Sequence, residues 1–113
     1  MANTIALFVL DTTSGQPAQG VRFVLQRHAV DGHWETVADG FTARDGLARE
    51  ALGGVELADG EYRIIYDTHS YFLSRNMTSI YRQIRVDFIA MDHRRYVLPL
   101  LMGPYSYTTY LGS

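Results

Sequence analysis

The 113-residue sequence contains no cysteine and no lysine. Without cysteine, a disulfide, a thiolate nucleophile and a thiolate-ligated metal are excluded, so stability must come from a hydrophobic core or from assembly. The ten basic residues are all arginine, a bias typical of GC-rich bacterial genomes. They are scattered among twelve acidic residues for a net charge of -2, so neither nucleic acid nor a membrane surface is an expected partner.

Long apolar runs are scarce as well, and none approaches the length of a membrane-spanning helix. Residues 1–10 are apolar but lack a basic leading region and run directly into a turn. We therefore interpret them as a strand rather than a signal peptide and expect a cytoplasmic protein. The chain length predicts a single domain over residues 1–113.

Apolar and polar residues alternate with a period close to two along most of the chain. With turn residues recurring between these stretches, the pattern predicts an all-β sandwich of about eight strands. The expected strands cover residues 4–11, 21–29, 33–38, a short edge segment within 41–52, 62–67, 83–91, 95–102 and 105–111. The first is apolar enough to be buried on both faces. Turns are expected at Asp31-Gly32, Asp39-Gly40, Asp45-Gly46 and Asp59-Gly60.

One segment, residues 67–76, departs from the two-residue period. Thr68, Tyr71 and Phe72 have the spacing of one helical face. This predicts a short helix with Asp67 or Thr68 as its N-cap.

Three segments carry a longer pattern. Residues 9–18 read VLDTTSGQPA, residues 62–72 read YRIIYDTHSYF and residues 96–113 read YVLPLLMGPYSYTTYLGS. In this order and spacing they resemble the transthyretin and 5-hydroxyisourate hydrolase family, whose hydrolases open with V-L-D-T-T-S-G-R-P-A and end in roughly Y-H-V-P-L-L-L-S-P-Y-G-Y-S-T-Y-R-G-S. The resemblance covers nearly the full length. It implies a two-sheet transthyretin-like β-sandwich and a homotetramer, a dimer of dimers with its sites in a central channel.

The same resemblance locates the chemistry of that channel. Hydrolases of this family line it with His from the first strand, Arg after an Asp-Gly turn, His on the penultimate strand and a terminal Arg. Carried over by motif, these positions fall on Phe8, Leu47, Val97 and Leu111. Hydrolysis requires a base for the water proton and a cation for the oxyanion, and apolar side chains supply neither. The resemblance thus implies a member that does not hydrolyse 5-hydroxyisourate.

Two interpretations of these replacements remain open. One is drift in an inactive copy whose channel fills with apolar residues. The other is a pocket rebuilt to bind a small apolar or aromatic molecule without a cofactor. Its walls would be Phe8, Leu47, Val97, Leu101 and Leu111.

The end of the chain offers the few polar groups near these walls. Tyr110 matches a Tyr of the hydrolase motif, where transthyretin carries a small residue that keeps its channel open, so it implies closed pockets. Tyr110 and Ser113 are the candidate catalytic residues. Thr109 is a candidate ligand contact that could instead only cover a sheet face. Alternation leaves open whether Tyr110 or Leu111 faces the pocket.

Three function classes follow. The favoured one is a non-hydrolytic enzyme that cyclises or isomerises an apolar metabolite by controlling its shape, as in bacterial secondary metabolism. The second is a small-molecule carrier or sensor, and the third is a 5-hydroxyisourate hydrolase with displaced residues such as His69 or Arg49. His28 and His33 flank a turn, where exposed histidine is commoner than a metal pair, so no metal is expected.

Overall fold

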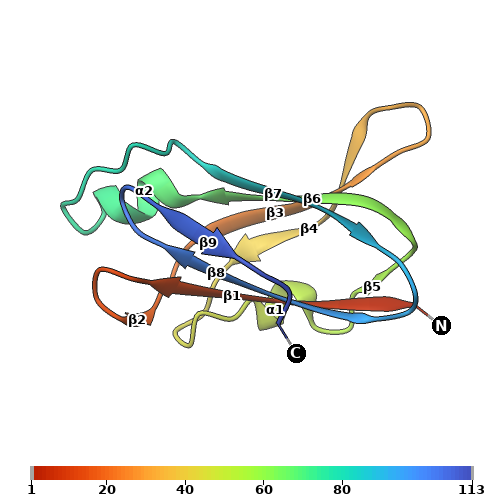
Figure 1. Cartoon of the computed structure of the whole chain (residues 1–113), viewed down its shortest axis with the longest axis horizontal. Helices are drawn as coiled ribbons and strands as arrows, with labels where there is room; N and C mark the ends of the chain where they lie inside the picture. Colours follow the sequence, from red (N-terminus) through yellow and green to blue (C-terminus); the bar gives the residue numbers. More distant parts are fainter. Residues whose placement is uncertain (1, 113) are drawn as a thin grey trace.

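The computed structural model describes residues 2–112, apart from the side chains of residues 50 and 51, and forms two packed β-sheets (Figure 1). The first sheet has the order β2-β1-β8-β9, with β5 paired to β1. Its strands are β1 (Asn3–Asp11), β2 (Gln16–Pro17), β5 (Glu56–Leu57), β8 (Arg95–Met102) and β9 (Tyr107–Thr109). The second has the order β4-β3-β6-β7 and contains β3 (Arg22–His28), β4 (Trp34–Phe41), β6 (Gly60–Asp67) and β7 (Ile84–Ala90). The helices are α1 (Arg49–Leu52) and α2 (Thr68–Leu73). The predicted all-β sandwich is confirmed.

The hydrophobic core lies between the two sheets. Alternate residues of β1 point inward, and Leu7 and Val9 are at most 1% exposed. They face the second sheet, whose inward residues are fully buried and include Phe23, Leu25, Ile64 and Tyr66. Each such side chain contributes about 1.5–3 kcal/mol by leaving water. The period-two pattern of the sequence is therefore the pattern of this core.

The first sheet is built on a parallel pair of strands from opposite ends of the chain. β1 pairs with β8 without a register shift, from Thr4 opposite Arg95 to Asp11 opposite Met102. The pairing continues beyond the strand, since the Thr12 amide donates to the Met102 carbonyl at 2.9 Å. Every other element of this sheet is attached to one of these two strands.

Helix α2 connects the two sheets through a buried polar contact. Asp67 caps the helix as predicted, accepting from the Ser70 amide at 3.2 Å. Three residues into the helix, the Tyr71 hydroxyl donates to Oδ2 of Asp11 at 2.9 Å, and Asp11 is only 1% exposed. The Thr13 amide donates to the other oxygen of this carboxylate at 2.9 Å. Asp11 thereby joins the end of β1, the following turn and α2.

Two predictions between residues 39 and 52 are wrong. The Asp39-Gly40 pair is not a turn but lies inside β4, because β3 offers a hydrogen-bonding partner as far as Phe41. The edge segment predicted within 41–52 is, after the end of β4 at Phe41, a loop followed by α1, and a bridge between Phe8 and Leu47 joins this loop to β1. Tertiary pairing outweighed the local turn signal in the first case. In the second, the predicted turn at Asp45-Gly46 is present, but the residues that follow it do not extend as a strand.

Two further expectations need correction. β1 is not buried on both faces, because Ala6, Phe8 and Leu10 are half-buried while their neighbours are buried. The last strand is also shorter than the predicted 105–111, since residues 103–106 form the turn that leads into β9. The two-residue strands β2 and β5 were missed, as they are too short to show a period. Neither helix among residues 2–112 is long and apolar enough to cross a membrane.

The contact between Tyr71 and Asp11 gives a test of this architecture. Tyr71→Phe leaves a buried carboxylate oxygen without its donor, so we expect the free energy of unfolding to fall by about 1–3 kcal/mol. Burial, reinforced by the Asp11 hydrogen bond and charge, raises the pKa of Tyr71 to about 12. The unfolded chain releases this proton near pH 10 while the folded chain retains it. This contribution to stability is therefore lost as pH rises from about 10 to about 12.

Urea unfolding at neutral pH and between pH 9 and 12 measures both effects. Tyr71→Phe should lower stability at pH 7 and flatten the alkaline loss. Some loss persists because burial also raises the pKa of Tyr66. Tyr105→Phe is the matched control, since Tyr105 is 67% exposed. Equal stability of the two variants at pH 7 would contradict the proposed role of the Asp11 contact.

Candidate functional site

The outer face of the first sheet is apolar along both of its central strands. Residues that face each other across β1 and β8 share a side of the sheet, and the inward pairs include Leu7 opposite Leu98. The alternate, outward pairs are Ala6 with Val97, Phe8 with Pro99 and Leu10 with Leu101. We call these six residues the apolar strip. None of them can ionise.

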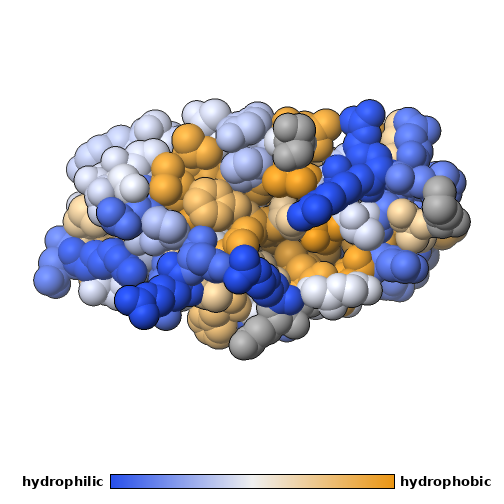
Figure 2. Space-filling model, turned by 90° about the horizontal axis from the view of Figure 1, so that it is seen from below, coloured by the Kyte–Doolittle hydropathy of each residue, from blue (hydrophilic) through white to orange (hydrophobic). Residues whose placement is uncertain are grey.

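The outer face of the second sheet is different in kind. Arg22 there forms an ion pair with Asp39 at 3.0 Å, and Arg63 lies over the ring of Trp34 at 4.2 Å. This face mixes such charged residues with apolar ones, among them the exposed Phe41 and Ile89, whereas the six residues of the strip are all apolar. Figure 2, which views the molecule from the side of the first sheet, shows an apolar area at the centre of the face with charged residues along its margins. The strip is therefore a specific property of one face.

Leu47, in the loop before α1, lies beside the strip. An antiparallel bridge places it opposite Phe8, and the Val9 amide donates to the Gly46 carbonyl at 3.0 Å. Gly46 has a φ of +81°, and a Cβ there would lie 2.6 Å from the Val9 carbonyl oxygen and 3.0 Å from Phe8 Cε1. Only glycine fits this approach without displacing β1. Gly46 thus positions Leu47 beside Phe8.

The C-terminal candidates separate onto two sides of the sheet. Leu100 lies opposite Thr109 in the β8–β9 pair, and the isolated bridge between Val97 and Gly112 keeps the same register. This register sets Tyr110 opposite Pro99, on the side of the apolar strip. Thr109 and Leu111 have the opposite parity, toward the side of Leu100.

The remaining contacts of this segment agree with that separation. The Thr109 hydroxyl donates to the Pro99 carbonyl at 2.7 Å, so it is used in holding β9 to β8. Tyr110 is 54% exposed and Leu111 49% exposed. Ser113 lies outside the described residues. The structure therefore brings Phe8, Leu47, Val97, Leu101 and Tyr110 to one face and does not bring Thr109 and Leu111 there.

A pocket of about 420 Å³ opens beside the strip. It lies between β1 and α1, where β1 is paired neither with β5 nor with Leu47. Ala6 belongs to both the strip and the pocket, and Leu47, which lies beside Phe8, also lines the pocket. The remaining lining residues are Ile5, Leu7, Ala48, Arg49, Leu52, Gly53 and Arg95. The pocket therefore adjoins the strip at Ala6.

Sequence reasoning missed three residues of the strip, namely Ala6, Leu10 and Pro99. The signal was present, because a strand that directs Phe8 outward directs Ala6 and Leu10 outward as well. It could not be used without knowing that Phe8 faces away from the core. Arg95 was missed as a lining residue for the same reason.

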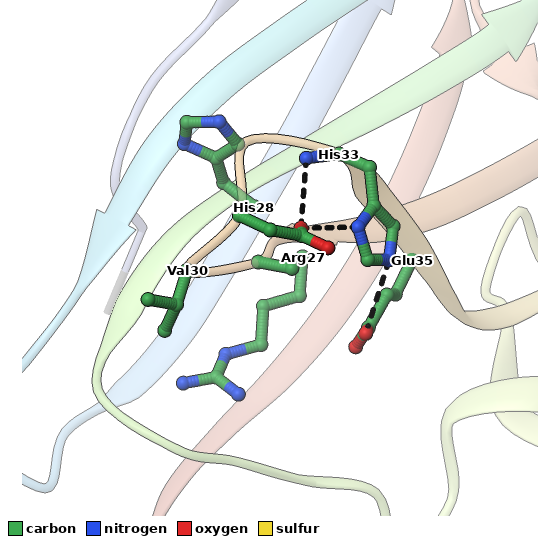
Figure 3. Close-up of a pocket in the computed structure, with 7 residues that line it drawn as sticks. Arg27, His28, Val30, His33 and Glu35 are labelled. Atoms are coloured by element: carbon green, nitrogen blue, oxygen red, sulfur yellow. Dashed lines mark hydrogen bonds and ion pairs between the residues drawn. The ribbon is translucent and has the colours of Figure 1, made fainter.

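A second hollow, of about 430 Å³, lies at the tip of the β3–β4 hairpin (Figure 3). The His33 ring is held between the carboxylates of Asp31 and Glu35, with Nε2 at 3.2 Å from Glu35 Oε1. His28 points away from it and pairs with Glu61 at 2.9 Å. Among residues 2–112, no group of three His, Asp or Glu side chains is arranged to hold a metal ion. Each of these histidines contacts its own carboxylate partners on an exposed hairpin.

The ionisable groups with raised pKa values are buried tyrosines of the core. Burial raises the pKa of Tyr62 and of Tyr66. Tyr71 is the third such group, and all three are used in packing or in the contact with Asp11. None is on the face that carries the apolar strip, so these groups do not supply a base or an acid there.

Comparisons with known proteins identify the family. A sequence model of the HIUase/Transthyretin family matches residues 5–112. The chain belongs to this family. The 5-hydroxyisourate hydrolase of Salmonella typhi is 34% identical over 113 residues, which cover 99% of this chain and 82% of the relative.

Solved structures of the family agree in fold. The 5-hydroxyisourate hydrolase of Klebsiella pneumoniae superposes with a TM-score of 0.86 at 28% identity, covering 98% of this chain and 99% of that one. Sea bream transthyretin in complex with thyroxine superposes with a TM-score of 0.88 at 30% identity, covering 96% of each chain. The predicted recognition of the family from three motifs is confirmed.

Gly46 gives a test of how the site face of this family member is held. Gly46→Ala should destabilise the protein by more than the roughly 1 kcal/mol typical of an alanine at positive φ, because its Cβ also meets backbone. Gly54→Ala is the control, since Gly54 has a φ of +79° but nothing within 4 Å of its added Cβ. Thermal unfolding of both variants measures the difference. Equal losses of stability in the two variants would show that the close approach of residue 46 to β1 does not require glycine at this position.

Proposed function

We propose that this protein binds a small apolar or aromatic molecule against the apolar strip and does not hydrolyse 5-hydroxyisourate. The observation that carries this proposal is the chemistry of the face itself: the outward residues of β1 and β8 from Ala6 to Leu10 and from Val97 to Leu101 are all apolar. A surface of this kind binds by excluding water, with a few polar groups at its margin for orientation.

The family's hydrolytic chemistry would need different side chains at this face. In the motif correspondence, the base and oxyanion positions are Phe8, Leu47, Val97 and Leu111. Positioned acid–base catalysis contributes about 10²–10⁴-fold, and an oxyanion donor about 10²–10³-fold. Losing both leaves little of an enzymatic rate. Three of these apolar replacements, Phe8, Leu47 and Val97, lie on one face beside further apolar residues, which favours a rebuilt pocket over random drift.

We further propose that the pocket is completed by other copies of the chain, as a homotetramer in which two dimers meet across the strips. The half-buried Phe8 and Leu101 support this, because an apolar face of this extent is normally covered in a folded protein. A two-fold axis would place two strips face to face and bury a ligand between them. Tyr110, on the same side as the strip, would then divide the space into closed pockets.

The favoured activity of such a pocket is a cyclisation or isomerisation directed by shape. A closed apolar cavity can hold a flexible molecule in its reactive conformer, which accelerates a unimolecular step without a titratable side chain. Tyr110 offers the one phenolic hydroxyl in the set of residues placed on this side, and it would orient or polarise the reacting group. Ser113 remains a candidate by its position in the motif.

A carrier or sensor is the second candidate, and the sea bream transthyretin complex with thyroxine supports it, since a protein of the same fold there holds a small aromatic molecule. A carrier releases its ligand unchanged, whereas the proposed enzyme releases a product that is a cyclised form or another isomer of the molecule it bound. NMR spectroscopy of the released compound discriminates the two. Of the two displaced candidates, Arg49 lines the pocket beside the strip, whereas His69, which would be the base, lies on α2, which follows the opposite sheet. A hydrolase with displaced residues is therefore weaker on this geometry, because the base is not at the pocket.

Direct assay tests the absence of hydrolysis. Freshly prepared 5-hydroxyisourate should decay with this protein at less than about ten times the buffer rate, because no side chain placed on this face is a general base for the water proton. The loss of its ultraviolet absorbance follows the decay. The Salmonella typhi hydrolase is the positive control. Acceleration comparable to that control would overturn the proposal and favour a displaced active site.

Substitution at the strip tests the assembly. Leu101→Glu would bury unpaired carboxylates between facing sheets, so we expect the tetramer to dissociate into dimers, with association weakened by at least about 100-fold. Sedimentation velocity measures the change. Val24→Glu is the matched control, because Val24 is half-buried on the outer face of the other sheet. A tetramer that survives Leu101→Glu but not Val24→Glu would show that the interface lies on the second sheet, and it would overturn the proposed assembly.

A further inference from the structure

The edge of β1 that faces away from β8 is open over a short stretch. On this edge β5 pairs with Asn3 and Thr4, and a bridge joins Phe8 to Leu47. Between these two contacts, no strand of the described chain pairs with residues 5–7 on this edge. At a rise of about 3.3 Å per residue, the opening from Thr4 to Phe8 is about 13 Å long. The pocket of about 420 Å³ lies at this opening and is lined by residues 5–7.

Two backbone groups face the opening without a partner. In a strand, the N–H and C=O of one residue point to the same edge, and successive residues alternate between the two edges. Val9 sets the parity, because its N–H donates to the Gly46 carbonyl at 3.0 Å and its C=O accepts from the Ala18 amide at 2.8 Å. Ile5 and Leu7 therefore face the same edge as Val9. Among residues 2–112, the C=O of Ile5 and the N–H of Leu7 form no backbone hydrogen bond.

A hydrogen-bond acceptor followed by a donor on a sheet edge is complementary to an extended peptide chain. A chain laid opposite Ala6, in either direction, donates an N–H to the Ile5 carbonyl and offers a C=O to the Leu7 amide. Leu47 and Leu52 line the same pocket, so an apolar side chain of that peptide has a place to bind. The opening thus has the two features by which sheet edges recognise peptides, main-chain pairing and a side-chain pocket.

The opening is closed at both ends, which limits what can enter it. β5 continues the sheet beyond Thr4, and Leu47 does so beyond Phe8. A chain that passed straight through would displace one of them, whereas a chain end needs room for only two or three residues. The charged residues that line the pocket are Arg49 and Arg95, and no carboxylate is among the described lining residues. This charge favours the carboxylate of a C-terminus over the ammonium of an N-terminus.

We propose that the open edge of β1 docks the C-terminal end of a partner protein as a short additional strand. The peptide groups of the partner pair with Ile5 and Leu7, and its carboxylate lies in the positive field of the two arginines. The docking site is the edge of the sheet, whereas the proposed small-molecule site is its outer face. The inference therefore goes beyond the proposed function and does not depend on it.

A short peptide tests the proposal on the intact protein. The probe is acetyl-Thr-Val-Thr-Val with a free carboxylate, and titration to about 5 mM populates most of a complex whose Kd is about 1 mM. In isotope-labelled protein followed by NMR, the Leu7 amide should shift downfield, and its exchange with solvent should slow at least about threefold, because it gains a hydrogen bond. The Ala6 and Phe8 amides face β8 and serve as controls within the same strand.

Two changes to the peptide test how it is recognised. The free acid should bind about fivefold to tenfold tighter than the same peptide with a C-terminal amide, because only the acid pairs with an arginine. N-methylation of successive peptide amides should abolish binding at alternate positions only, since alternate N–H groups face β1.

Variants of the protein test the charge and the location. Arg49→Gln combined with Arg95→Gln should remove the preference for the acid and leave the amide peptide unchanged. Arg82→Gln combined with Arg85→Gln makes the same change in net charge at β7 of the other sheet and should have no effect. Leu101→Glu removes the strip as an apolar surface, but Leu101 does not line the pocket, so the peptide should bind as before.

The outcomes separate this inference from the proposed function. An unchanged Leu7 amide, or equal shifts of the three amides from Ala6 to Phe8, would overturn the docking edge whatever binds the strip. Loss of peptide binding in Leu101→Glu would place the peptide on the strip, and equal effects of the two double variants would reveal only a general charge effect; both contradict the proposal. Peptide binding that survives Leu101→Glu, while no apolar small molecule binds the unmodified protein, would support the docking edge and sink the proposed function.

Discussion

The parallel pairing of β1 with β8 is the contact on which the rest of the structure depends. It joins residues about 90 positions apart in sequence along the full length of both strands. One side of this pair closes the core against β3 and β6, and the other side carries the apolar strip. The turn at Gly46, the hydrogen bond from Tyr71 of α2 to Asp11 and the bridge to Gly112 all attach to these two strands. The site is therefore an outer surface of the same element that holds the fold.

Most of the fold could be predicted from the sequence because burial in a sandwich has the period of the strand. Strands such as β3, β6 and β7 have alternating apolar residues, and their positions were predicted to within a few residues. The errors fall where a nonlocal partner decides the outcome. Gly40 is extended only because Phe23 lies opposite it, and Leu47 touches the sheet only because Gly46 approaches Val9. Neither partner can be read from the local sequence.

The site could be predicted only in part, because family motifs identify which residues correspond to site positions but not the side of the sheet to which each side chain points. Phe8, Val97 and Leu101 were named and do lie on one face, whereas Thr109 and Leu111 were named with them and have the opposite parity. The choice between Tyr110 and Leu111 needed the register of β9 against β8, which places Tyr110 opposite Pro99. Arg95 has no motif signal, and its place at the end of the strip follows only from the pairing with Thr4.

The strict alternation of β1 has a consequence for how such a protein can change over generations. Leu7 and Val9 are held by the core, so substitutions there are costly, while Ala6, Phe8 and Leu10 on the opposite side have few partners within the chain. Residues that stabilise the core and residues that face the candidate site thus alternate along the same strand. The outward residues can be substituted while the inward residues stay the same. The activity of such a scaffold can therefore change without passing through a variant that does not fold.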